Sequence, residues 1–278
     1  MTLKRILVHV NVSKHCAPRL AVAARLAQSF EARLAGIFTS AAGDVPYFMM
    51  QEVASRTEPT MRGWWQQTRD RLRADFEACT AATGVAADWI ELGHDVEAGL
   101  ARLARTADLT VVGQVDADEL LPRPEYAIPE RIALDAGGPA LLVPTQGTIA
   151  SVGQRVLVAW DGSAPAARAL KDAMPFLARA GHVTILTIEA GKPGAADGET
   201  TGAAAIDFLS RHGVGASLRI APGEDAAVGD VILAEAGTAA ADLVVMGAYG
   251  HPRAREFILG GATRTMLKRM TVPVLMAH

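Results

Sequence analysis

A glycine-rich stretch near the C-terminal end holds the residues whose spacing most directly suggests chemistry. Gly247, Gly250, Gly260 and Gly261 follow a hydrophobic run, and Thr263 opens the helical pattern behind them. Glycines let backbone amides approach an anion closely, and a helix N-terminus adds unpaired N–H groups and the positive end of its dipole. The stretch could therefore cradle a phosphate. Alternatively, the glycines only end a strand and reverse the chain, with Thr263 as the helix N-cap.

Other signatures of phosphate binding and catalysis are missing from the sequence. The glycines do not follow the G-x-G-x-x-G spacing, and no G-x-x-x-x-G-K-[ST], H-E-x-x-H or G-x-S-x-G occurs. The seven histidines are scattered singly, so no metal site is predicted. We therefore expect a protein that is not an enzyme, with slow nucleotide hydrolysis as the alternative.

The composition is that of a soluble globular protein. Of the 278 residues, 50% are hydrophobic and 21% are charged, and the formal net charge of −3 does not suggest a nucleic-acid or membrane-surface binder. The two cysteines form no C-x-x-C pair and no disulfide framework. No apolar run reaches the roughly 20 residues of a membrane span. We expect a cytoplasmic protein.

The elements that must position the glycines belong to an internal repeat. Residues 5–38 align with residues 155–188 without a gap, and ADLTVVG (107–113) corresponds to ADLVVMG (241–247). In each copy, runs of Ile, Leu and Val alternate with helical segments. The runs lack strict polar alternation, as expected for a parallel sheet that is covered on both faces.

We predict two tandem α/β domains, residues 1–145 and 154–278, each with a five-stranded parallel sheet and helices on both faces. Right-handed crossovers connect successive strands in such a fold. Residues 145–154 are rich in small and turn-forming residues and serve as the linker. Ligands of open α/β sheets bind outside the carboxyl ends of the strands, and Gly247 ends the fourth strand of the second copy.

The spacing Gly247-x2-Gly250-x9-Gly260, followed by a small residue and a threonine, resembles the ATP-binding motif of the universal stress protein family. The opening strand and Asp-x-Ser turn of that family are similar to residues 155–170, RVLVAWDGSAPAARAL. Its closing strand is similar to residues 270–278, MTVPVLMAH. The whole chain thus resembles a tandem universal stress protein. The resemblance implies Rossmann-like, adenine nucleotide alpha hydrolase-like domains of strand order 3-2-1-4-5. It also implies an adenine nucleotide across the ends of strands one and four.

The resemblance assigns binding roles to residues of the second copy. Asp161 would contact the ribose, and Ala159 and Ile188 would wall the adenine. The residues that would border the ribose and phosphates, or form the phosphate-binding helix start, are Met246, Gly247, Tyr249, Gly250, Gly260, Gly261, Ala262 and Thr263. The implied ligand is ATP, or ADP or AMP in its place, with Mg as an accompanying ion.

Two features of the second copy keep alternatives open. Gly261 stands where the family has Ser or Thr, which removes a hydroxyl worth about 1 kcal/mol if it bonded the ligand. WDGSAP can also be a simple helix entry that Asp161 or Ser163 caps. Arg253 and Arg255 could reach phosphates or remain solvated.

The first copy has lost the nucleotide pattern. Asn11 stands at the position of Asp161, Asp116 at that of Gly250, and no glycine pair precedes the last helix. Asp116, together with Asp118 and Glu119, would repel a triphosphate. We predict that the first domain does not bind ATP in the manner of the family. Because this copy builds the same strand and helix without the glycine spacing, a purely structural account of the glycines is weakened.

The first copy also contains an insertion, in which residues 61–83 are predicted to be helical. Trp64, Trp65, Leu72 and Phe76 are its apolar anchors. Packing in the core or at a subunit interface is the favoured explanation for them, and contact with a partner or ligand is the alternative.

Universal stress proteins commonly pair through the edge strand, so the resemblance implies that the closing strand of the second copy (272–278), which is too apolar for an exposed sheet edge, pairs with residues 139–144 of the first. The result would be an internal pseudo-dimer, and a further homodimer stays open. The function that this pattern favours is an ATP-binding regulatory module of the stress response, acting on an unidentified protein partner. The alternatives are an interaction scaffold that binds no nucleotide and a slow ATP hydrolase.

Overall fold

The computed structural model describes residues 2–39, 47–93, 96–116, 128–189, 198–223, 228–248 and 261–278, with side chains of the long helix described from residue 63 onward. The first half contains β1 (Arg5–Val10), α1 (Cys16–Phe30), β2 (Arg33–Thr39), α2 (Tyr47–Thr83), β3 (Ala87–Leu92), α3 (Val96–Ala104), β4 (Leu109–Gly113), α4 (Ile128–Asp135) and β5 (Ala140–Val143). The second half contains β6 (Arg155–Ala159), α5 (Ala164–Asp172), α6 (Met174–Leu177), β7 (His182–Glu189), α7 (Gly198–Arg211), β8 (Ser217–Pro222), α8 (Val228–Thr238), β9 (Leu243–Gly247), α9 (Gly261–Arg269) and β10 (Val274–Ala277).

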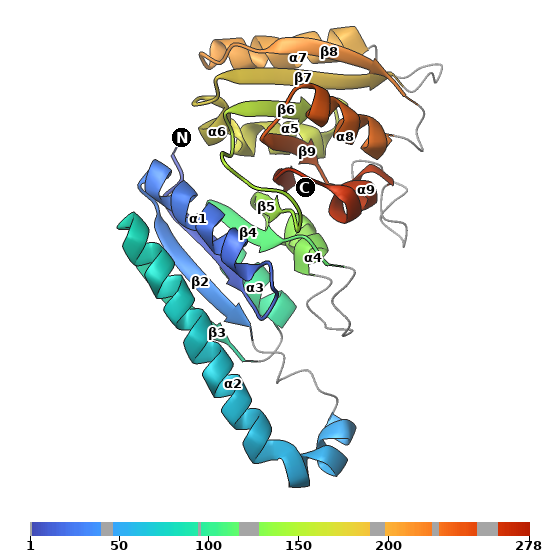
Figure 1. Cartoon of the computed structure of the whole chain (residues 1–278). Coiled ribbons are helices and arrows are strands. Elements are labelled where there is room, and N and C mark those ends of the chain that lie inside the picture. The colour runs from blue at the N-terminus through green and yellow to red at the C-terminus, as the bar shows by residue number, and fades with distance from the viewer. Residues whose placement is uncertain are drawn as a thin grey trace.

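The described strands form one ten-stranded sheet of order β3-β2-β1-β4-β5-β10-β9-β6-β7-β8, with helices on both faces (Figure 1). Each half therefore has the predicted order 3-2-1-4-5, and its strands pair in parallel. The halves meet where β5 and β10 pair antiparallel, with Leu275 opposite Leu141. The predicted fold and the predicted internal pairing of the closing strands are confirmed.

Two hydrophobic layers, one on each face of the sheet, hold the helices in place. Side chains alternate between them along each strand: Ile6 and Val8 of β1 face the layer that α1 and α5 cover, whereas Leu7 faces the layer of α3, α4, α8 and α9. Each layer runs through both halves without interruption. The central strands are buried on both faces, which explains why their sequences are apolar without alternation.

The insertion of the first half forms helix α2, which begins at Tyr47 and is longer than predicted. Leu72 and Phe76 are buried against the sheet, and the Phe76 ring lies 5.6 Å from that of Trp89 on edge strand β3. Trp64 is 51% exposed, and its nearest aromatic contact is an edge-on one with Trp65 at 4.7 Å between centroids. Core packing is therefore confirmed for Leu72 and Phe76 and is wrong for Trp64.

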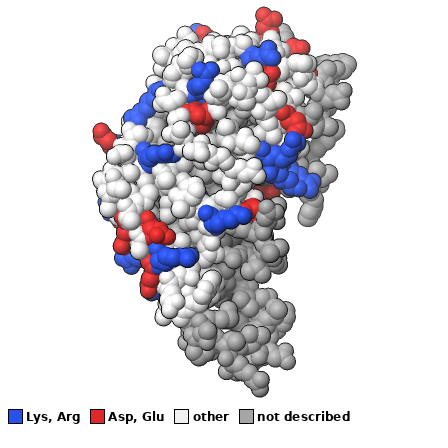
Figure 2. Space-filling view, in the orientation of Figure 1, with Lys and Arg blue, Asp and Glu red and all other residues white. Residues whose placement is uncertain are grey.

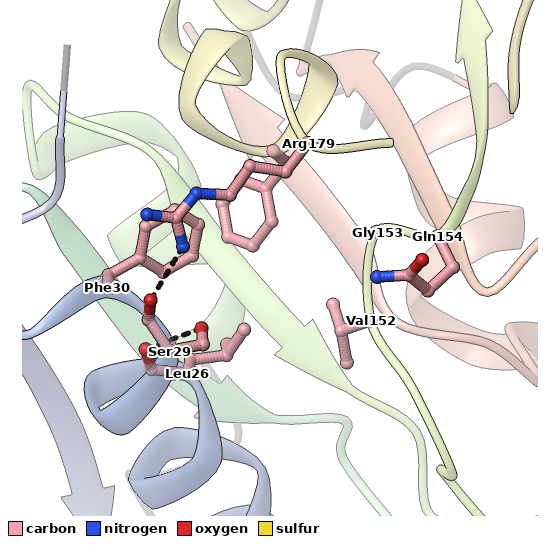
Figure 3. A pocket seen from close by; sticks show the side chains of 8 residues that line it. Leu26, Ser29, Phe30, Val152, Gly153, Gln154 and Arg179 are labelled. Carbon is pink, nitrogen blue, oxygen red and sulfur yellow. Dashed lines mark hydrogen bonds between the residues drawn. The ribbon is translucent and has the colours of Figure 1, made fainter. Parts of the chain in front are cut away.

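The joint between the halves is reinforced beside the linker (Figure 3). The rings of Phe30 on α1 and Phe176 on α6 meet edge to face at 5.2 Å. Arg179 lies over the Phe30 ring at 4.2 Å and donates from Nη1 to the carbonyl oxygen of Ser29 at 2.7 Å. Val152 and Gln154 of the linker complete a pocket of about 160 Å³ at this point.

The surface and the helices fit the balanced composition of the chain. On the face seen in Figure 2, the described basic and acidic side chains lie interspersed among uncharged ones. Among the helices that the structure describes, none combines the length and the hydropathy that a membrane span requires.

The Asp242 carboxylate fixes the linker to the start of β6, and its loss should destabilise the joint. It accepts hydrogen bonds from Ser151 Oγ at 2.5 Å and from the backbone amides of Gly153, Gln154 and Arg155 at 3.1, 3.0 and 2.8 Å. We expect Asp242→Ala to lower the free energy of unfolding by about 2–3 kcal/mol, because several charge-assisted hydrogen bonds are lost together.

Chemical denaturation measures this effect, and Asp108→Ala is the matched control. Asp108 occupies the corresponding position of the first half but accepts from only two amides, those of Lys4 and Arg5, both at 2.8 Å. A smaller loss is expected for it, and equal losses in the two variants would contradict a special role of Asp242 at the joint.

Candidate functional site

The ends of β6 and β9 bring the predicted nucleotide residues of the second half to one edge of the sheet, called here the carboxyl edge. The two strands are parallel neighbours, with Ala159 opposite Met246. The helix that follows β6 packs in one hydrophobic layer and the helix that follows β9 packs in the other, so the connections leave to opposite faces. An open α/β sheet binds ligands at such a switch point.

Asp161 follows β6 and is exposed at this edge. Its Oδ1 accepts a hydrogen bond from the backbone amide of Ser163 at 2.9 Å. Ser163, not Asp161, is the N-cap of α5: its Oγ accepts from the Ala166 amide at 3.3 Å, and Pro165 lies in the first turn. Asp161 Oδ2 accepts no hydrogen bond from any described residue. One oxygen therefore shapes the turn, and the other remains available as an acceptor.

Gly247 has a packing role of its own. A Cβ on this residue would lie 2.6 Å from the Ala166 amide nitrogen and 2.7 Å from the Pro165 carbonyl carbon. Only a residue without a side chain lets the end of β9 approach the first turn of α5 so closely. The structural account that the sequence pattern weakened thus holds for Gly247, and this close approach places the α5 N-terminus beside β9.

The residues predicted to wall the adenine are partly accessible. Ala159 and Ile188 are half-buried at the ends of β6 and β7, and Ile188 lies over Gly223 at the end of β8. Met246, by contrast, is only 4% exposed and its side chain belongs to the core, so only its backbone borders the edge.

The start of α9 shows how the predicted phosphate site begins. Gly261 is the exposed first residue of the helix, and Ala262 is half-buried. Thr263 is 3% exposed, and it is not without an interaction partner. A Cβ on Gly261 would meet nothing within 4 Å, so packing does not exclude the Ser or Thr of the family. Tyr249, Gly250 and Gly260 lie outside the described residues, as do Arg253 and Arg255.

The carboxyl edge of the first half, where β1 and β4 end, is built differently. Arg19, on α1, donates from Nε to the His9 carbonyl oxygen at 2.8 Å and from Nη2 to Asn11 Oδ1 at 2.7 Å. The guanidinium covers Gly113, the counterpart of Gly247, so it fills the place that the helix start occupies in the second half. The side-chain oxygen that corresponds to Asp161 Oδ1 is therefore bound to the protein's own arginine.

A second contact ties the two loops of this edge together. Asp116, which stands where the second half has Gly250, pairs with Lys14 Nζ at 2.7 Å and with His15 Nε2 at 2.9 Å. His9 is buried within the strand, with Nε2 2.8 Å from Thr39 Oγ1. Burial, with the Arg19 charge as the second cause, holds the pKa of His9 well below its ordinary value of 6.5.

Arg19 is the residue of this edge that the sequence pattern did not single out. The repeat alignment contains a signal for it, because Arg19 corresponds to Ala169, which is fully buried in α5. An arginine at a position where the other copy buries an alanine is a candidate for a buried side chain. Within the described residues, no three His, Cys, Asp or Glu side chains are grouped so that they could hold a metal ion.

Comparisons with known proteins show a family signature in the C-terminal segment and a shared fold over the whole chain. The sequence model of the Universal stress protein family matches residues 222–278, which include β9, α9 and β10. A universal stress protein from Archaeoglobus fulgidus DSM 4304 matches over 98% of this chain and 97% of its own, with 18% identity and a TM-score of 0.69. A functionally unknown protein from Pseudomonas aeruginosa PAO1 matches over 99% and 92%, with 16% identity and a TM-score of 0.56. A search of curated proteins finds no match.

The chain has the tandem α/β fold of these structures from end to end. Its C-terminal segment carries the sequence signature of the universal stress protein family, so the resemblance inferred from the sequence is confirmed.

Replacing Gly247 should destabilise the second half. Gly247→Ala would place a methyl group against the backbone of Pro165 and Ala166, which cannot rotate away as a side chain could. We expect a loss of about 1–3 kcal/mol in the free energy of unfolding, the usual range for overpacking.

Gly237→Ala is the matched control for this denaturation experiment. Gly237 lies in α8, and a Cβ there would meet nothing within 4 Å, so alanine should stabilise the helix by up to about 1 kcal/mol. A Gly247→Ala protein as stable as the wild type would show that the start of α5 can move away from β9.

Proposed function

We propose that this protein is an adenine-nucleotide-binding regulatory module of the stress response, with the nucleotide bound at the carboxyl edge of the second half. One observation carries the proposal: Asp161 keeps one carboxylate oxygen without a hydrogen bond from the described residues, at the point where β6 and β9 end. A ribose hydroxyl is a donor that such an oxygen binds well.

The neighbouring groups suit the other parts of a nucleotide. Ala159 and Ile188 offer a partly accessible apolar surface for the base. The exposed start of α9 at Gly261 offers backbone amides and the positive end of a helix dipole for the phosphates. ATP meets this arrangement best, and ADP or AMP would use the same ribose and base contacts. Mg would accompany the phosphate oxygens.

We propose that the nucleotide acts by occupancy rather than by turnover. Among the described polar side chains at this edge, Asp161 is held in its turn by the Ser163 amide, Thr263 is buried, and His278 lies with Nδ1 2.9 Å from the Ala248 carbonyl oxygen. Neither Asp161 nor His278 is hydrogen-bonded to a described nucleophile, which is the arrangement that hydrolysis by general-base catalysis needs. Binding would instead change the surface that the carboxyl edge of the second half offers to a protein partner.

Replacing the Asp161 carboxylate tests the proposal. Asp161→Asn keeps an oxygen for the Ser163 amide and removes the negative charge, so the turn should persist while the ribose contact weakens. We expect the affinity for ATP to fall about tenfold, the equivalent of one charge-assisted hydrogen bond. The measurement is the ATP-dependent rise in melting temperature, with and without magnesium.

Asp172→Asn is the matched control, because it removes the same charge at the opposite end of α5, where Asp172 pairs with Arg168. It should leave ATP binding unchanged. The proposal is contradicted if the denatured wild-type protein releases no adenine nucleotide and ATP with magnesium causes no thermal shift. Sustained phosphate release that Gly250→Asp abolishes would replace the regulatory role with hydrolysis.

A further inference from the structure

The Arg19 side chain of the first half is a buried cation without a carboxylate partner among the described residues. It is 3% exposed. The oxygens that accept its hydrogen bonds are the His9 carbonyl at 2.8 Å and the Asn11 amide oxygen at 2.7 Å, and both are uncharged. Arginine is almost never fully buried unless it is paired with an anion.

A buried and uncompensated charge is costly, and its field reaches the neighbouring groups. Taking a guanidinium out of water costs several kcal/mol, which neutral acceptors only partly offset. Burial first, and the Arg19 charge second, lower the pKa of the neighbouring His9. The end of β1 is therefore an electropositive position that lacks its counter-ion.

One nitrogen of the guanidinium remains accessible. Nη1 donates no hydrogen bond to a described residue, and it lies against Gly113 at the end of β4. Among the described residues, the only fully buried side-chain nitrogen or oxygen without a partner is Thr187 Oγ1, in the other half. Nη1 therefore keeps contact with solvent at the carboxyl edge between β1 and β4.

Among the described residues, the charge at this position that lacks a counter-ion is the positive one of Arg19. Asp118 and Glu119, which would repel a triphosphate, lie outside the described residues. Asp116, the carboxylate on the loop after β4, is already paired with Lys14 and His15, so it does not neutralise Arg19. The corresponding position of the second half carries the opposite charge: Asp161 stands where the first half has Asn11, and a buried alanine stands where it has Arg19. A carboxylate accepts from a hydroxyl, whereas a guanidinium donates to an oxyanion.

We propose that the carboxyl edge of the first half binds a compact oxyanion of the phosphate type, free or as a small monoester, through Arg19. Because Nε and Nη2 are already held by protein oxygens, Nη1 would donate the charge-assisted hydrogen bond to an oxygen of such a group. The site is chemically distinct from the nucleotide site proposed for the second half, and neither proposal depends on the other.

Calorimetric titration with inorganic phosphate, at an ionic strength held constant with sodium chloride, tests this site. The titration uses the full chain carrying Gly250→Asp, which places a carboxylate in the glycine stretch of the second half and so removes phosphate binding there. We expect this protein to bind phosphate, and Arg19→Met in the same background to bind at least about tenfold more weakly. Arg25→Met, which removes an exposed arginine of the same helix, should have no effect.

Two further arms keep the test decisive. If Arg19→Met does not fold, Arg19→Lys keeps the charge without the Nη1 donor position and should weaken binding several-fold. Glycerol 3-phosphate distinguishes the sources, because it binds more tightly than inorganic phosphate if the ligand is a monoester and more weakly if it is the free ion. No phosphate-specific heat in the Gly250→Asp protein, or unchanged affinity in both Arg19 variants, would overturn the proposal. Loss of ATP binding alone in Gly250→Asp concerns only the nucleotide site.

Discussion

The antiparallel pairing of β5 with β10 is the constraint on which the rest of the molecule depends. It joins two parallel sheets into one and lets both hydrophobic layers run through the whole chain. Neither closing strand could stand as an exposed edge, because all four residues of each are buried. Since the pairing is antiparallel, the carboxyl ends of the two sets of strands lie at opposite edges of the ten-stranded sheet. Each edge can therefore have a ligand chemistry of its own.

The two edges share a backbone plan and differ in charge. In the second half, Gly247 lets the start of α5 pack on β9, and Asp161 presents an acceptor. In the first half, the Arg19 guanidinium fills the corresponding space and takes the oxygen of Asn11. A fold therefore does not fix the ligand. The difference arises from a few side chains at the ends of two strands.

The repeat in the sequence predicts two tandem α/β domains, because period and turn residues carry that information, whereas the strand order and the joint follow from the family resemblance. The sequence also predicts that Asp161 or Ser163 caps the helix after β6. Only the structure shows that Ser163 is the N-cap and that Asp161 stabilises the turn before it. The burial of Arg19 was not predicted, since an arginine in a helical pattern normally marks an exposed face. Helix α2 begins at Tyr47 rather than at residue 61, so it continues through Pro59, a residue type that normally interrupts a helix. These features depend on packing partners that are distant in the chain.

The central claim is that only one of the two halves binds a nucleotide at its carboxyl edge. The number of nucleotides bound per chain tests this claim most directly. Titration calorimetry of the nucleotide-free protein with ATP and magnesium gives this number. The account predicts one nucleotide per chain, with binding that survives substitution of Arg19. Two nucleotides per chain, or none, would contradict it.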